Sequence, residues 1–77
     1  MQIKTANDFG NLIKIARKKS RLTQTTLAAA CGVGPRFIRE LENGKANCQL
    51  EKALLIAQML GIKFNAALPP GLDGESK

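Results

Sequence analysis

The chain has 77 residues and a formal net charge of +6, so it can form one small domain with a marginal core, and a second copy that buries more surface would support it. Two cysteines and no histidine exclude a zinc site, and we expect both cysteines to be reduced, in a reducing cytoplasm. Residues 1–20 are charged throughout, so no signal peptide is expected, and no apolar run is long enough to span a membrane.

A first helix is expected over residues 6–19. Thr5 and Asp8 have the spacing of a capping box at its start. Apolar residues then recur at helical spacing and predict a core stripe of Phe9, Leu12, Ile13 and Ala16. The basic residues at the far end complement the helix dipole or contact phosphate, and both interpretations stay open for Lys18, Lys19 and Arg21.

Two short helices joined by a glycine turn are expected over residues 24–41. Thr23 is a suitable N-cap for the first of them, and Gly32 is typical of a left-handed residue that ends it. Gly34 can cap the second helix, and Pro35 suits the first helical position, where a missing N–H costs nothing. This is the helix-turn-helix pattern, in which the second helix enters the major groove of DNA.

The second of these helices has one packing face and one solvent face. Phe37, Ile38 and Leu41 pack, which leaves four residues towards solvent: Pro35, Arg36, Arg39 and Glu40. Residues 14–45 contain eight basic residues against two acidic ones, so the positive charge lies on the helix-turn-helix half, as a phosphate-binding surface requires. The alternative is a basic face that only promotes solubility.

A fourth helix is expected from about Cys48 to Leu60, with Asn47 as its N-cap. Its core stripe is predicted to be Leu50, Ala53, Leu54, Ala57 and Leu60. Three apolar residues then remain on a neighbouring face with nothing in so short a chain to cover them, namely Leu55, Ile56 and Met59. We expect a subunit interface there, and the alternative is a set of scattered exposed apolar side chains.

Residues 62–68 alternate apolar and polar after Gly61 and predict a β-strand that Pro69 and Pro70 end. A strand with no partner in its own chain is an exposed edge, which the same strand of a second protomer can pair. The dimer interface would then add Ile62, Phe64, Ala66 and Leu68. Residues 1–68 would form one DNA-binding domain that includes this dimerisation strand, and residues 69–77 a flexible, disordered tail.

The pattern of Gln24, Leu27, Ala28, Gly32, Val33, Ile38, Leu41 and the ENGK of residues 42–45 resembles the lambda-repressor-like, or XRE, helix-turn-helix family over residues 9–61. The LTQ, RFI and LGIKF segments are also similar to HipB-like and Y4mF-type antitoxins. The resemblance implies an all-α domain of four to five short helices with a C-terminal β-strand that pairs across a homodimer. It matches Arg17 to a first-helix arginine that pairs with a glutamate of the third helix, here Glu42. The alternative for Arg17 is an exposed surface arginine.

The expected chemistry is the binding of double-stranded DNA, with no cofactor. Candidate base-reading residues are Pro35, Arg36, Arg39 and Glu40; an arginine can donate two hydrogen bonds to guanine, and Glu40 can accept from cytosine or orient an arginine. Pro35 replaces a polar residue common in the family and can touch only a thymine methyl. Candidate phosphate contacts are Arg17, Gln24, Thr25, Asn43 and Lys45.

The function expected from these features is that of a homodimeric repressor on a palindromic operator. The resemblance implies an antitoxin that autoregulates its type II toxin–antitoxin operon and pairs with a HipA-like serine/threonine kinase toxin. A free-standing repressor or a restriction-modification controller is the alternative, and a protein-interaction adaptor that does not bind DNA is a third. An enzyme is not expected, because the chain has no histidine and no Cys or Ser with an evident base.

Overall fold

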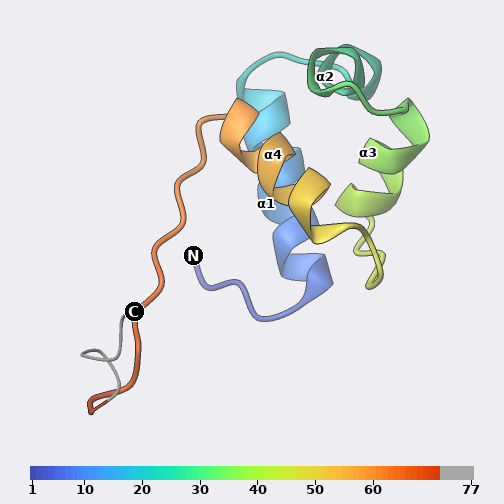
Figure 1. Cartoon of the computed structure of the whole chain (residues 1–77). Coiled ribbons are helices and arrows are strands. Elements are labelled where there is room, and N and C mark those ends of the chain that lie inside the picture. Colours follow the sequence, from blue (N-terminus) through green and yellow to red (C-terminus); the bar gives the residue numbers. More distant parts are fainter. Residues whose placement is uncertain (72–77) are drawn as a thin grey trace.

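The computed structural model describes residues 1–71, and within them the chain forms four helices. The helices are α1 (Ala6–Lys19), α2 (Gln24–Cys31), α3 (Pro35–Glu42) and α4 (Leu50–Met59). α3 packs against both α1 and α2, and α2 also packs against α4 (Figure 1). The expected all-α architecture is confirmed. None of the helices in residues 1–71 is long and apolar enough to cross a membrane.

The expected capping box at the start of the first helix is present. Thr5 Oγ1 accepts a hydrogen bond of 3.0 Å from the Asp8 amide, and Asp8 Oδ2 accepts one of 3.1 Å from the Thr5 amide. This reciprocal capping box fixes the start of α1 at Ala6. At the other end, Arg21 has a φ of 60°, a left-handed conformation that non-glycine residues rarely adopt.

The turn between α2 and α3 also forms as its residue types predict. Thr23 Oγ1 accepts from the Thr26 amide at 3.0 Å and caps α2. Gly32 ends α2 with a φ of 72°, where a Cβ would be strained. Gly34 then precedes α3, and Pro35 occupies its first turn. This geometry sets the angle at which α3 leaves α2.

The core lies where α1, α2, α3 and α4 meet, and each helix contributes one large, fully buried side chain. These four side chains are Ile13, Leu27, Ile38 and Ile56. Gly10 allows α1 and α3 to approach closely, because a Cβ added there would lie 2.7 Å from the Glu42 carbonyl oxygen. The end of α3 is therefore held directly against the backbone of α1.

The expected core stripe of α4 is wrong in part. The residues that face the core are Ala53, Ile56 and Ala57, whereas Leu50 and Leu54 are 69 % and 44 % exposed. Because α4 is apolar on nearly all sides, its periodicity does not define which face is buried, and the small alanines face the core beside α2. The helix also starts later than expected, with Gln49 and not Asn47 at its N-cap.

The predicted strand at residues 62–68 is not formed in the single chain, which contains no strand within residues 1–71. Ile62 packs against the core, and the Phe64 ring stacks on the Phe9 ring with centroids 5.8 Å apart. The chain then runs away from the helices (Figure 1). Residues 72–77 of the predicted tail lie outside the described residues.

Candidate nucleic-acid interface

α3 lies at the outer edge of the molecule (Figure 1), and the side chains on one of its faces are exposed to solvent. Ile38 and Leu41 anchor the other face in the core. On the open face, Pro35, Arg36 and Arg39 are exposed, as expected. The Arg36 side chain is 79 % exposed. Such a helix is fixed by the core on one side and is cationic on the other. It can therefore enter the major groove of DNA without rearrangement of the fold.

Glu40 joins two cations at this surface. Its Oε2 lies 3.0 Å from Arg36 Nε, and its Oε1 lies 3.1 Å from Lys45 Nζ. These hydrogen bonds from Lys45 and Arg36 lower the pKa of the Glu40 carboxyl below its ordinary value. The structure thus brings three candidate DNA-binding residues into one charged cluster. The four-residue spacing of Arg36 and Glu40 on a helix could have indicated their pairing from the sequence.

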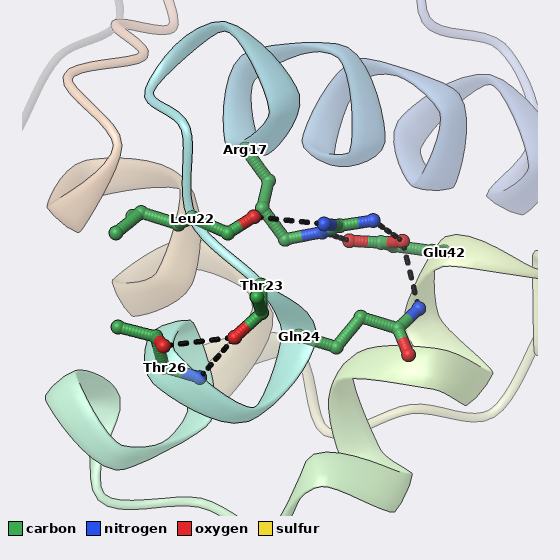
Figure 2. A network of polar contacts seen from close by, with 6 residues as sticks. All are labelled: Arg17, Leu22, Thr23, Gln24, Thr26 and Glu42. Atoms are coloured by element: carbon green, nitrogen blue, oxygen red, sulfur yellow. Dashed lines mark hydrogen bonds and ion pairs between the residues drawn. The ribbon is translucent and has the colours of Figure 1, made fainter.

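A second polar network lies inside the domain, between α1, α2 and α3 (Figure 2). Arg17 donates from Nε to Glu42 Oε2 at 2.6 Å and from Nη2 to Glu42 Oε1 at 3.0 Å. Its Nη1 donates to the Leu22 carbonyl oxygen at 2.9 Å, and Gln24 Nε2 donates to Glu42 Oε1 at 3.0 Å. The expected pairing of Arg17 with Glu42 is confirmed. Every buried side-chain polar atom in residues 1–71 has a hydrogen-bond partner.

Charge is stabilised in this network despite its burial. Burial raises the pKa of the Glu42 carboxyl, but the hydrogen bonds from Arg17 and Gln24 and the positive charges of Arg17 and Lys14 together outweigh burial, and the net effect is a lowered pKa. The hydrogen bond to Glu42 in turn raises the pKa of the Arg17 guanidinium. Both groups are therefore ionised at neutral pH. The pair fixes the end of α3 relative to α1 and the start of α2.

The network restricts two of the candidate phosphate contacts. The Arg17 side chain is only 10 % exposed, and each of its three nitrogens already donates a hydrogen bond within the fold. The Gln24 side chain is directed to Glu42, a partner that its position in the sequence did not indicate. The amides of Gln24 and Thr25, in the first turn of α2, have no intrahelical partner by helix geometry. Phosphate binding at this helix start remains a prediction for the backbone amides.

The remaining candidate phosphate residues lie on the surface. Thr25 and Asn43 are exposed, and Lys45 is exposed beside Glu40. The backbone N–H of Asn43 caps the end of α3 by donating to the carbonyl oxygens of Arg39 and Leu41. Asn43 therefore ends the helix, and its side chain stays available at the surface.

The candidate dimer residues fall into two groups. Leu55 and Met59 on α4 are 42 % and 52 % exposed, and on the C-terminal segment Phe64, Ala66 and Leu68 are exposed and Ile62 is half-buried. The placement of Ile56 on an open face is wrong, because its side chain is fully buried in the core. Leu50 and Leu54 extend the exposed apolar surface of α4 in its place.

Cys31 and Cys48 are free thiols, both half-buried, and burial raises the pKa of Cys31. No cluster of three or more His, Cys, Asp or Glu side chains that could hold a metal ion occurs within residues 1–71.

A protein-family model and an individual relative both match this chain. The helix-turn-helix family model HTH_3 matches residues 13–66. The chain is 44 % identical over 68 residues to the uncharacterized HTH-type transcriptional regulator y4mF of Sinorhizobium fredii (strain NBRC 101917 / NGR234), covering 88 % of this chain and 90 % of that protein.

Solved structures of HipB share the fold. A HipB–O4 20mer complex superposes with a TM-score of 0.78 at 25 % identity, covering 87 % of this chain and 94 % of that one. A HipA–HipB–O2–O3 complex gives the same TM-score, identity and coverage.

Proposed function

The chain belongs to the XRE-type helix-turn-helix family of transcriptional regulators, and on that premise we propose that it is a sequence-specific repressor that binds a palindromic DNA operator as a homodimer. The single observation that carries the proposal is the open cationic face of α3, supported from behind by the core. A recognition helix needs this combination of a fixed orientation and free donors.

Base reading is assigned to the exposed residues of α3. Arg36 and Arg39 can each donate two hydrogen bonds to guanine O6 and N7 in the major groove. Pro35 can contact a thymine methyl group. Glu40 can accept a hydrogen bond from cytosine N4, or it can orient an arginine. The second role is supported by its contact with Arg36 Nε, which lies 3.0 Å from Glu40 Oε2.

Phosphate contacts would set the register of α3 in the groove. They are assigned to the α2 start, through the amides of Gln24 and Thr25, and to Asn43 and Lys45 at the end of α3. Arg17 would contribute mainly by fixing α3, because its side chain is largely buried.

A homodimer is supported by apolar surface that the single chain leaves uncovered. Leu54, Leu55 and Met59 are exposed on α4, and Phe64 and Leu68 are exposed on the segment that follows. Residues 62–68 would pair with their counterparts across the twofold axis and form the two-stranded sheet there. Two copies of α3 would then reach half-sites about one helical turn apart.

The biological role we propose is that of a cytoplasmic antitoxin that represses its own operon and pairs with a HipA-like serine/threonine kinase toxin. Support comes from the likeness to HipB, which one solved complex contains together with HipA and DNA. A free-standing repressor would share the DNA binding but not the partner, so copurification with a kinase-like protein separates the two. An adaptor without DNA binding has no specific observation in its favour.

The test is binding to the DNA upstream of the gene, with two single variants. Arg36→Ala should cost about 1–3 kcal/mol of specific binding and relax one base position, because it removes a bidentate contact. Lys45→Ala should weaken binding to all sequences alike and reduce the slope of log K against log salt by about 1. If the wild type fails to bind at low salt, the proposed function is wrong. If both variants lose affinity uniformly, Arg36 is a phosphate ligand.

A further inference from the structure

Glu40 lies between the two exposed cations and is less exposed than either. Its side chain is 30 % exposed, compared with 79 % for Arg36 and 46 % for Lys45. Each carboxylate oxygen accepts from a different cation, at 3.0 Å from Arg36 Nε and 3.1 Å from Lys45 Nζ. A base edge that approaches α3 would therefore meet Arg36 before it meets Glu40.

The contact with Glu40 determines which donors of Arg36 remain free. A guanidinium carries five N–H groups on three nitrogens, and here the Nε–H is directed to Glu40. Both terminal amino groups remain available, and they form the fork that matches guanine O6 and N7. The carboxylate thus leaves the base-reading end of Arg36 open while it holds the inner end.

Holding Arg36 before DNA arrives also reduces the conformational entropy lost on binding. An exposed arginine samples many rotamers, and a side chain restrained near its bound geometry gives up fewer of them. The second ion pair, to Lys45, links this restraint to the turn that follows α3. A carboxylate with both oxygens engaged is correspondingly less available to a cytosine amino group.

From this geometry we propose that Glu40 is a positioning residue that orients Arg36 for base reading and does not itself read a base. The inference rests on the DNA binding proposed above and decides between the two roles left open for Glu40. Glu40 then sets specificity through Arg36, and its removal weakens the preference at the base pair that Arg36 reads.

The experiment is selection from a duplex DNA library with a randomised central region, carried out in parallel with the wild type and single variants. Glu40→Ala is preferred to Glu40→Gln, because a glutamine side chain can itself read adenine. Arg36→Ala identifies the base pair that Arg36 reads. Glu51→Ala is the matched control, because it removes the same charge from an exposed position on α4. Circular dichroism verifies that every variant is folded.

The expected result is that Arg36→Ala abolishes the preference at one base pair of each half-site. Glu40→Ala should reduce the preference at that same base pair by about two- to fivefold, the range expected for an exposed ion pair. The double variant should match Arg36→Ala, and Glu51→Ala should match the wild type.

Two results would overturn the inference while leaving the proposed function intact. Loss of preference at a different base pair in Glu40→Ala would show that Glu40 reads a base directly. An unchanged preference in Glu40→Ala would show that Arg36 needs no positioning. A wild type that selects no sequence at all would instead overturn the proposed function, and this inference with it.

Discussion

Arg17 and Glu42 form two parallel hydrogen bonds, 2.6 Å and 3.0 Å long, that join the last turn of α1 to the end of α3 (Figure 2). The planar guanidinium matches the carboxylate in both position and charge. Gln24 adds a third hydrogen bond from α2 to the same carboxylate. The orientation of the candidate recognition helix therefore depends on a polar contact as well as on the core.

Removal of one partner from this buried pair should destabilise the domain. Arg17→Met leaves Glu42 buried without its cation. Loss of one partner from a buried ion pair typically costs about 3–5 kcal/mol of unfolding free energy. We expect a loss of about 3 kcal/mol, at the lower end of that range, because the Arg17 side chain is 10 % exposed. The double variant Arg17→Met/Glu42→Met should recover most of this loss. Urea unfolding at a fixed protein concentration measures both. A double variant as unstable as the single one would contradict this explanation.

Acid should weaken the same contact. The pKa of Glu42 is lowered in the folded state: burial raises it, but the hydrogen bonds from Arg17 and Gln24 together with the positive charges of Arg17 and Lys14 lower it by more. The contribution of Glu42 to stability is thus fully present above its ordinary pKa of 4.5 and is lost as the pH falls through its folded-state value. The wild type should lose more unfolding free energy than the Arg17→Met/Glu42→Met variant between about pH 7 and pH 3. Equal losses would show that Glu42 does not carry the effect.

Gly10 provides a test of the close approach between α1 and α3. In an isolated helix, Gly→Ala stabilises by about 0.5–1 kcal/mol, but here the new Cβ would lie 2.7 Å from the Glu42 carbonyl oxygen. We therefore expect Gly10→Ala to destabilise by about 1–3 kcal/mol. Gly34→Ala, where a Cβ meets nothing within 4 Å, is the control for steric contact in the same thermal unfolding series; it should lose only the preference for glycine over alanine at the N-cap of α3. A more stable Gly10→Ala variant would contradict the described contact.

Phe64 tests the proposed subunit interface. The residue is 45 % exposed, so a charge placed there should prevent two copies from associating while the helices of each chain remain folded. Phe64→Asp is expected to sediment as a monomer. Asn65→Asp adds the same charge to the neighbouring residue and should remain dimeric. A dimeric Phe64→Asp variant would remove this segment from the interface. Circular dichroism checks that loss of the Phe9–Phe64 stack does not unfold the chain.

The sequence predicted α1, α2 and α3 well because local chemistry defines their ends. The residue types at the helix ends indicate their roles: Thr5 and Thr23 are N-caps, Gly32 is a left-handed C-cap, and Pro35 lies in the first turn of α3. The core face of α4 could not be predicted in the same way, since a helix that is apolar all round has no unique buried stripe. Its pattern predicts Ile56 on an open face, whereas the side chain is fully buried in the core. The strand at residues 62–68 requires a partner that a single chain does not contain.

In the candidate site, too, some features follow from the sequence and others do not. The exposure of Arg36 and Arg39 follows from helical spacing and is seen in the structure. The direction of the Gln24 side chain does not follow from the sequence, because its partner, Glu42, lies 18 residues away and comes close only when α2 and α3 pack. Gly10 had no local signal either, since its role depends on the backbone of another helix.

We propose that two copies of α3 read successive major grooves on one side of a duplex. Hydroxyl-radical footprinting of the wild type on the DNA upstream of its gene tests this arrangement. This arrangement should give two protected patches on the same face of the duplex, centred about 10 base pairs apart, over sequences related by a twofold axis. A single patch, or protection without twofold-related sequences, would contradict it.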